Sequence, residues 1–164
     1  MSATDLENTL YLDVPAGRVV IELRPDLAPG HVARIKELAR QKFYDGIVFH
    51  RVIDGFMAQT GDPRGDGTGG SGKKLKAEFN SAKHVRGTAS MARAQSPDSA
   101  DSQFFICFKP APFLDGKYTV WGQVTSGMEH IDAIKKGDED DNGAVDDPDK
   151  IIRMQVAADA EGGK

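Results

Sequence analysis

An arginine and a glutamine stand within otherwise apolar stretches and are the residues best suited to chemistry. Arg51 lies in the run Phe49-His50-Arg51-Val52-Ile53, and Gln59 ends the run Phe56-Met57-Ala58-Gln59. Successive side chains of a strand point to opposite faces, so Arg51 should leave the sheet on the face opposite its two neighbours. Core packing accounts for the aromatic residues but not for these polar ones, because buried polar groups need partners. The pattern predicts a charged, hydrogen-bonded site beside an apolar surface.

Three later segments add strand and aromatic material that could complete such a site. They are Ser90-Met91-Ala92-Arg93-Ala94, Ser102-Gln103-Phe104-Phe105-Ile106 and Phe113-Leu114-Asp115-Gly116-Lys117-Tyr118. The first two read as strands, and the third places aromatic and apolar residues near a turn. Together these segments predict additional strands and an aromatic, apolar surface near a turn.

The elements that must position these residues are mostly strands. A hairpin around Pro15-Ala16-Gly17 is expected, and a helix should begin at Pro29-Gly30 and run to about Lys42. Further strands are predicted at 48–53, 87–92, 103–108, 118–124 and 151–157, with a second helix over Met128–Lys136. Many strands and two helices favour a mainly β fold, a closed or nearly closed barrel whose open ends the helices cover.

Size and charge narrow the function further. The 164 residues suit a single domain, residues 1–164 with a core of about 9–158, and no linker divides them. The net charge of -4 argues against nucleic acid or an anionic membrane as the main partner. No signal peptide and no apolar span are visible, so a cytoplasmic location is expected. Cys107, the only cysteine, sits in an apolar run and is expected to be buried and inert.

Three motifs match known patterns only superficially. The stretch 65–70 satisfies G-x-G-x-x-G, and 67–73 resembles most of a phosphate-binding loop, but neither has the strand before it and the helix after it that such sites need. His50, Asp54 and Ser90 could be imagined as a hydrolase triad, yet no serine lies in a nucleophile elbow. A long loop that brings backbone close to a ligand is the favoured interpretation of the glycines.

The acidic segment Asp138–Asp149 leaves an alternative open. Its oxygen-bearing residues fall at positions 1, 3, 5, 9 and 12 of an EF-hand-like loop, namely Asp138, Asp140, Asn142, Asp146 and Asp149. Position 12 is an aspartate, which reaches less well than glutamate, and a strand is expected after the loop in place of a helix. A solvated acidic turn is favoured, with a weak calcium site as the alternative.

Taken in order, the motifs resemble those of the cyclophilins over about Thr9–Ala158. They are Phe49-His50-Arg51, Gly55-Phe56-Met57-Ala58-Gln59, Gly67-Thr68-Gly69-Gly70, Ser90-Met91-Ala92, Ser102-Gln103-Phe104-Phe105-Ile106 and Phe113-Leu114-Asp115-Gly116-Lys117. The resemblance implies an eight-stranded antiparallel closed β-barrel capped by two α-helices. It also implies peptidyl-prolyl cis/trans isomerisation on Xaa-Pro peptides held in an exposed groove, without cofactor or metal.

The resemblance also assigns roles to residues. Arg51 resembles the catalytic arginine, with Gln59 beside it, and Phe56, Met57, Phe105 and Leu114 resemble the proline pocket. Gln59 and the Ala92 backbone resemble groups that hold the peptide. The remaining substrate-binding positions are Arg93, Ala94, Gln103, Phe113 and Tyr118. The implied partners are proline-containing peptides and unfolded proteins, and a monomer is expected.

Departures from the family pattern bear on ligands. Phe113 stands where cyclosporin-sensitive members usually carry tryptophan, so weak cyclosporin binding is expected. Tyr118 replaces a frequent histidine and Arg93 a frequent asparagine, as in bacterial members. A module that binds proline-containing segments without turnover is the alternative function, but the retention of both Arg51 and Gln59 favours the enzyme.

Overall fold

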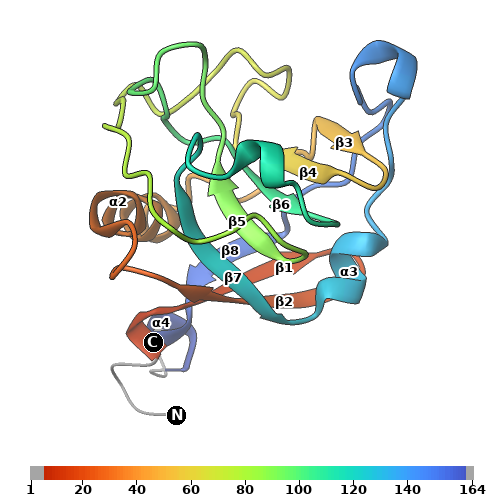
Figure 1. Ribbon diagram of the computed structural model, residues 1–164. Coiled ribbons are helices and arrows are strands. Elements are labelled where there is room, and N and C mark those ends of the chain that lie inside the picture. The colour runs from red at the N-terminus through yellow and green to blue at the C-terminus, as the bar shows by residue number, and fades with distance from the viewer. Residues whose placement is uncertain (1–5, 162–164) are drawn as a thin grey trace.

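One curled antiparallel sheet dominates the computed structural model, which describes residues 6–161 (Figure 1). The strands are β1 (Thr9–Val14), β2 (Gly17–Leu23), β3 (Arg51–Ile53), β4 (Met57–Thr60), β5 (Thr88–Met91), β6 (Phe104–Cys107), β7 (Val120–Ser126) and β8 (Arg153–Val156). The helices are α2 (Pro29–Arg40), α3 (Met128–Asp132) and α4 (Ala157–Glu161), with the short 3-10 turns η1 (Pro112–Leu114) and η2 (Glu139–Asp141). The prediction of a mainly β, eight-stranded antiparallel fold is confirmed.

The expectation of a closed barrel is wrong, because the sheet is an open half-barrel. Its strands run in the order β3-β4-β6-β5-β7-β2-β1-β8, which leaves β3 and β8 at opposite ends. Between these ends the described residues form only isolated bridges, such as Val48 with Lys150 and Arg51 with Ala144. Asp147 has a φ of 54° and Pro148 lacks an amide hydrogen, so this segment cannot extend a ladder that would close the sheet.

Helix α2 follows the predicted apolar stripe and covers β8. Its buried residues include Val32, Ile35, Leu38 and Ala39. The helix ends at Arg40, two residues before the predicted end, since Lys42 takes a left-handed φ of 61°.

The other helices differ more from expectation. Helix α3 is shorter than the predicted 128–136, although Ile131 and Ile134 are buried as expected. A third helix, α4, begins where the last strand was expected to end, because the alanine-rich run after Val156 favours a helix.

Two apolar clusters lie on opposite faces of the sheet. Along β6, Phe104 and Ile106 belong to the main core, whereas Phe105 and Cys107 belong to a second, smaller cluster. The second cluster also contains Met57, Ala111 and Leu114. Strand alternation thus builds an apolar surface outside the main core, and this surface underlies the candidate site.

Candidate active site

A cavity of about 470 Å³ opens over the second cluster and gathers most of the predicted site residues. It is lined by Arg51, Phe56, Met57, Gln59, Ala92, Arg93, Phe105, Phe113, Leu114, Lys117 and Tyr118. Ala94 and Gln103 line a neighbouring cavity of about 260 Å³, which shares Gln59, Ala92 and Arg93 with the first. The two cavities therefore form one continuous groove that includes every residue the sequence nominated.

The guanidinium of Arg51 is held from two sides. Its Nη1 donates to Oε1 of Gln59 at 3.0 Å, directly across the β3–β4 pair. Its Nε donates to the backbone carbonyl of Asn142 at 3.0 Å, and its Nη2 donates to Oδ1 of the same residue at 3.2 Å. Burial lowers the pKa of Arg51 from its ordinary value, but a guanidinium remains charged at neutral pH. The result is a fixed, partly desolvated positive charge at the edge of an apolar pocket.

A chain of side-chain amides links Arg51 to the glycine-rich loop. Gln59 Nε2 donates to Gln103 Oε1 at 2.9 Å, and Gln103 Nε2 donates to the carbonyls of Gly67 and Gly69, each at 3.0 Å. Because both Gln59 groups are occupied, its amide orientation is fixed by its partners. Gln59 thereby couples the arginine to the wall of the neighbouring cavity.

Carboxylates hold the glycine-rich loop in shape. Asp62 accepts hydrogen bonds from the backbone N–H groups of Arg64, Asp66 and Gly67. Burial opposes ionisation of Asp62, but these bonds outweigh it and lower its pKa. Within 67–73 the backbone N–H of Gly67 donates to Asp62, that of Thr68 to Asp66, and those of Ser71 and Gly72 to Asp101. These N–H groups are thus already bonded to carboxylates, in agreement with the interpretation of this segment as a shaped loop.

The apolar half of the groove has a buried floor and an exposed rim. Met57, Phe105 and Leu114 are buried, and the ring of Tyr118 meets Phe105 edge-on at 5.9 Å between centroids. Phe113 is 62% exposed and its ring lies 5.5 Å from that of Phe56. An apolar ring of modest size could rest on this floor while its attached chain stays in the open groove.

Arg93 forms a second cationic wall through stacking. Its guanidinium lies 4.7 Å from the centroid of the Tyr118 ring and 5.9 Å from that of Phe79. Both Nε and Nη2 donate to the carbonyl of Lys117, at 3.0 and 2.8 Å. Lys117 lies in the motif Phe113–Lys117 but was not assigned a role, and Phe79 was not predicted, because no local pattern links it to the groove.

Asn142 contacts the candidate site but is not among the residues that the sequence assigns to it. The sequence pattern places Asn142 only among the possible oxygen ligands of a calcium loop, yet its backbone carbonyl and its side chain both accept hydrogen bonds from Arg51. The dipeptide Asn142-Gly143 signals a tight turn, and Asn142 indeed has a φ of 55°. That signal locates the turn but cannot name its partner, which lies 91 residues away in the chain.

The calcium alternative finds no support in residues 6–161. Within that range no three His, Cys, Asp or Glu side chains come together to hold a metal ion. The carboxylates at both ends of the proposed loop already accept backbone hydrogen bonds: Asp138 accepts from the N–H of Asp140 within the loop, and Asp149 from that of Lys135 outside it.

The structure also bears on the hydrolase triad, on the single cysteine and on a membrane span. Ser90 is fully buried and its hydroxyl faces His84, so it forms no triad with His50 and Asp54. Cys107 is buried as expected, and burial raises the pKa of its thiol to about 12, which keeps it protonated and inert. In the part of the chain described, no helix has the length and apolar character needed to cross a membrane.

Comparison with known proteins decides the family. The model of the family described as cyclophilin type peptidyl-prolyl cis-trans isomerase/CLD matches residues 9–156. The chain belongs to the cyclophilin family. The family match and the names of its relatives identify this cyclophilin as a peptidyl-prolyl cis-trans isomerase. The enzyme is therefore favoured over the alternative of a binding module without turnover.

Sequence relatives carry the same activity in their names. This cyclophilin is 55% identical to a probable peptidyl-prolyl cis-trans isomerase of Brucella suis, over 98% of its own length and 88% of the relative's. It is 48% identical to peptidyl-prolyl cis-trans isomerase B of Bacillus subtilis, over 78% of its own length and 90% of the relative's.

Solved structures show the same fold. A cyclophilin from Hirschia baltica, AquaCyp293, superposes with a TM-score of 0.83 at 27% identity, covering 93% of this chain and 74% of that one. A cyclophilin-type isomerase of Cryptosporidium parvum, determined in the presence of the dipeptide Ala-Pro, gives a TM-score of 0.82 at 28% identity, covering 90% and 98%.

Proposed function

We propose that Arg51 is the catalytic residue and that the floor formed by Met57, Phe105 and Leu114 holds the proline ring. The observation that carries this proposal is the position of a fixed guanidinium at the edge of a buried apolar floor, within one cavity of about 470 Å³. Phe56 and Phe113 extend the apolar surface along the rim. A proline ring seated there would bring its nitrogen close to Arg51.

The chemistry requires little more than a well-placed charge. Rotation about a peptide bond costs about 18–20 kcal/mol because the resonance of the C–N bond must be broken. In the twisted state the proline nitrogen regains a lone pair and accepts a hydrogen bond. A guanidinium beside that nitrogen stabilises the twisted state more than either planar isomer, which is the requirement for catalysis.

The magnitude is within reach of such a site. Uncatalysed isomerisation takes about 10–100 s, so turnover within a millisecond requires an acceleration of roughly 10⁴–10⁵-fold, or about 5.5–7 kcal/mol. Pre-organised, partly desolvated donors contribute a large share of such differences. Gln59 and Asn142 supply the pre-organisation, because they fix the guanidinium before substrate arrives.

The rest of the groove would bind the peptide chain. Ala92, Arg93 and Ala94 line the wall between the two cavities, where a peptide backbone can run beside them. Gln103 lines the smaller cavity and is hydrogen-bonded to Gln59, and Tyr118 supports Arg93 by stacking. We assign these residues to peptide binding, with Gln59 both orienting Arg51 and bordering the peptide.

Replacement of Arg51 tests the proposal. We expect Arg51→Ala to lower kcat/KM for a proline peptide at least about tenfold, with an unchanged melting temperature. Arg51→Lys keeps a charge but cannot contact Gln59 and Asn142 together, so it should also be impaired. The matched control is Arg86→Ala, an exposed arginine paired with Asp132 away from the groove. Wild-type activity in Arg51→Ala would refute the assigned role.

The partners we propose are unfolded proteins with exposed Xaa-Pro bonds, acted on by a monomer in the cytoplasm. The groove is open, which suits a segment of unfolded chain. Acceleration of a refolding phase limited by proline isomerisation would support this, and its absence at catalytic concentration would contradict it. Light scattering tests the monomer, and cell fractionation tests the location.

A further inference from the structure

A buried histidine outside the groove contacts one residue of its floor, Phe105, and two residues that adjoin the floor, Asp115 and Ser90. His84 is 1% exposed and lies just before β5. Its ring stacks on that of Phe105, with centroids 6.0 Å apart and planes 17° from parallel. Its Nδ1 lies 3.0 Å from Oδ1 of Asp115, the residue that follows Leu114, and its Nε2 lies 2.8 Å from the hydroxyl of Ser90 on β5. One imidazole thus joins β5, β6 and the turn after η1.

The proton positions in this cluster follow from its partners. A carboxylate only accepts hydrogen bonds, and Oδ1 of Asp115 already accepts the backbone N–H of His84 at 2.7 Å, so it requires a proton on Nδ1 as well. In the neutral ring Nε2 is then an acceptor, and the Ser90 hydroxyl donates a hydrogen bond to it. Burial lowers the pKa of His84 and outweighs the opposing effect of Asp115. The ring is therefore neutral at pH 7.

The contacts at its two nitrogens fix the orientation of the imidazole ring. Ser90 also lies 3.0 Å from the carbonyl of Thr119, but its single hydroxyl proton can serve only one acceptor at a time. That carbonyl keeps a bond from the backbone N–H of Met91 at 2.9 Å, so it is satisfied when Ser90 turns to His84. The imidazole is therefore fixed at both nitrogens and cannot rotate away from Phe105.

We propose that His84 is a positioning residue of the isomerase: clamped between Asp115 and Ser90, it holds Phe105 and Leu114 at the spacing that seats the proline ring. This inference rests on the proposed role of that floor. His84 does not itself line the groove, so it acts on bound peptide only through Phe105 and Asp115. Loss of the clamp should weaken peptide binding and leave the Arg51 chemistry of bound substrate in place.

Two substitutions separate the two halves of the clamp. In His84→Asn the amide can still reach Asp115 but not Ser90, whereas in His84→Gln it can reach Ser90 but not Asp115. We expect each to raise KM for a proline peptide about fivefold or more while kcat changes less than about twofold. Ile35→Val, a buried change in α2 far from the groove, is the control for stability loss alone and should leave KM unchanged.

Nitrogen NMR of the histidine ring gives an independent measurement. The expected state at pH 7 is the neutral ring with its proton on Nδ1, whereas a proton on Nε2 would overturn the clamp. An unchanged KM in both His84 variants would also overturn the inference, provided that Arg51→Ala is inactive. If Arg51→Ala instead keeps full activity, the proposed function itself fails, and the two failures are distinguishable.

Discussion

The catalytic role that we propose for Arg51 depends on the fixed direction of its guanidinium as well as on its charge. Three of its nitrogens are bonded, two of them to a single residue, Asn142, whose backbone has a left-handed φ of 55°. Left-handed backbone costs a residue with a Cβ about 1 kcal/mol, less for asparagine than for most, and nothing for glycine. The carbonyl and the side chain of Asn142 can thus be tested separately.

Substitution of Asn142 separates these two contributions. Asn142→Gly keeps the turn and its carbonyl but removes Oδ1, so we expect a loss of about threefold in kcat/KM. Asn142→Ala also disfavours the left-handed backbone, and should lose about tenfold. Asp147→Gly, at another left-handed position with a φ of 54°, is the matched control and should keep wild-type activity. Equal activity of the wild type and Asn142→Ala would contradict this view of the arginine.

Phe113 offers a test of ligand selectivity at the rim. It is 62% exposed and carries no hydrogen-bond donor in its side chain. We expect weak cyclosporin binding by the wild type, and a gain of at least about tenfold in Phe113→Trp, since an indole adds an N–H donor and apolar area. Titration calorimetry measures both proteins. A nanomolar dissociation constant for the wild type would contradict the prediction.

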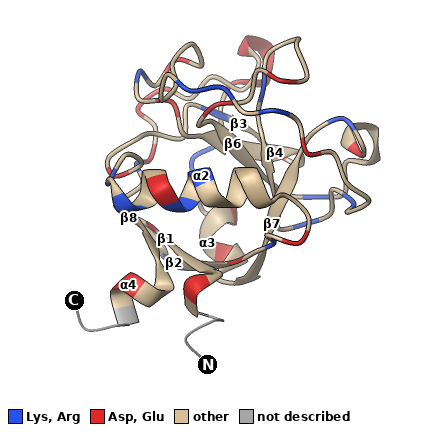
Figure 2. Cartoon of the chain, turned by 90° about the vertical axis from the view of Figure 1, so that its left-hand side faces the viewer, with Lys and Arg blue, Asp and Glu red and all other residues tan. Residues whose placement is uncertain are grey.

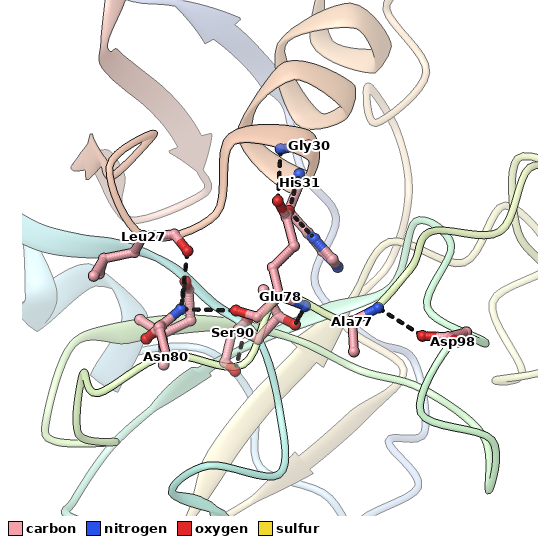
Figure 3. A network of polar contacts seen from close by, with 10 residues as sticks. Leu27, Gly30, His31, Ala77, Glu78, Asn80, Ser90 and Asp98 are labelled. Atoms are coloured by element: carbon pink, nitrogen blue, oxygen red, sulfur yellow. Dashed lines mark hydrogen bonds and ion pairs between the residues drawn. The ribbon is translucent and has the colours of Figure 1, made fainter.

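Among the secondary elements, α2 depends on a residue from outside itself. Its N-cap, Ala28, has no side-chain hydrogen bond. Figure 3 shows that the carboxylate of Glu78 takes this role, accepting from the backbone N–H groups of Gly30 at 3.0 Å and His31 at 2.7 Å. The same carboxylate lies 2.6 Å from Nδ1 of His31. The helix that covers β8 is therefore capped by a loop residue 48 positions later.

Removal of this cap should cost stability and leave the chemistry unchanged. We expect Glu78→Ala to lower the free energy of unfolding by about 1–2 kcal/mol, the usual value of an N-terminal cap. Urea denaturation measures the change. Glu37→Ala, an exposed glutamate of the same helix, is the control and should have little effect. A loss in Glu78→Ala no larger than in the control would show that the cap is dispensable.

Local patterns predicted those elements whose energetics are local. The β1–β2 hairpin could be predicted from its Pro/Gly turn and from the strand-like pattern on either side of it, and α2 could be predicted from its apolar stripe. The contacts of Asn142, Glu78 and His84 could not be predicted, because each joins segments more than 30 residues apart or depends on a buried geometry. The closed barrel was overpredicted since it required a ladder near Pro148 that the backbone cannot make.

On the scale of the whole molecule, the net charge of -4 conceals an even mixture of signs. Basic and acidic residues interleave along α2 and around the loops (Figure 2). Several carboxylates are bonded within the fold: hydrogen bonds from His84 lower the pKa of Asp115, and those from His31 and Gly30 lower the pKa of Glu78 against the effect of its burial. These groups favour the ionised form in the folded protein.

The half-buried His50, the buried His84 and the bonded carboxylates make stability depend on pH in the same direction. Burial lowers the pKa of both His50 and His84 below the ordinary 6.5, so below that pH the unfolded chain binds more protons than the folded one. Stability rises with pH wherever the unfolded state holds more protons. The histidine contribution is therefore complete above about pH 6.5 and is lost as pH falls towards the folded values.

The carboxylates act in a lower window. Because the pKa values of Asp62, Glu78 and Asp115 are lowered on folding, their contribution is complete above about pH 4.5 and is lost on further acidification. We expect the free energy of unfolding, measured in urea from about pH 8 to about pH 2, to be flat above pH 7 and to fall in two stages. His84→Asn should reduce the first stage. A stability that increases as pH falls from 7 to 5 would contradict the histidine assignment, because the lowered pKa values of His50 and His84 predict the opposite sign.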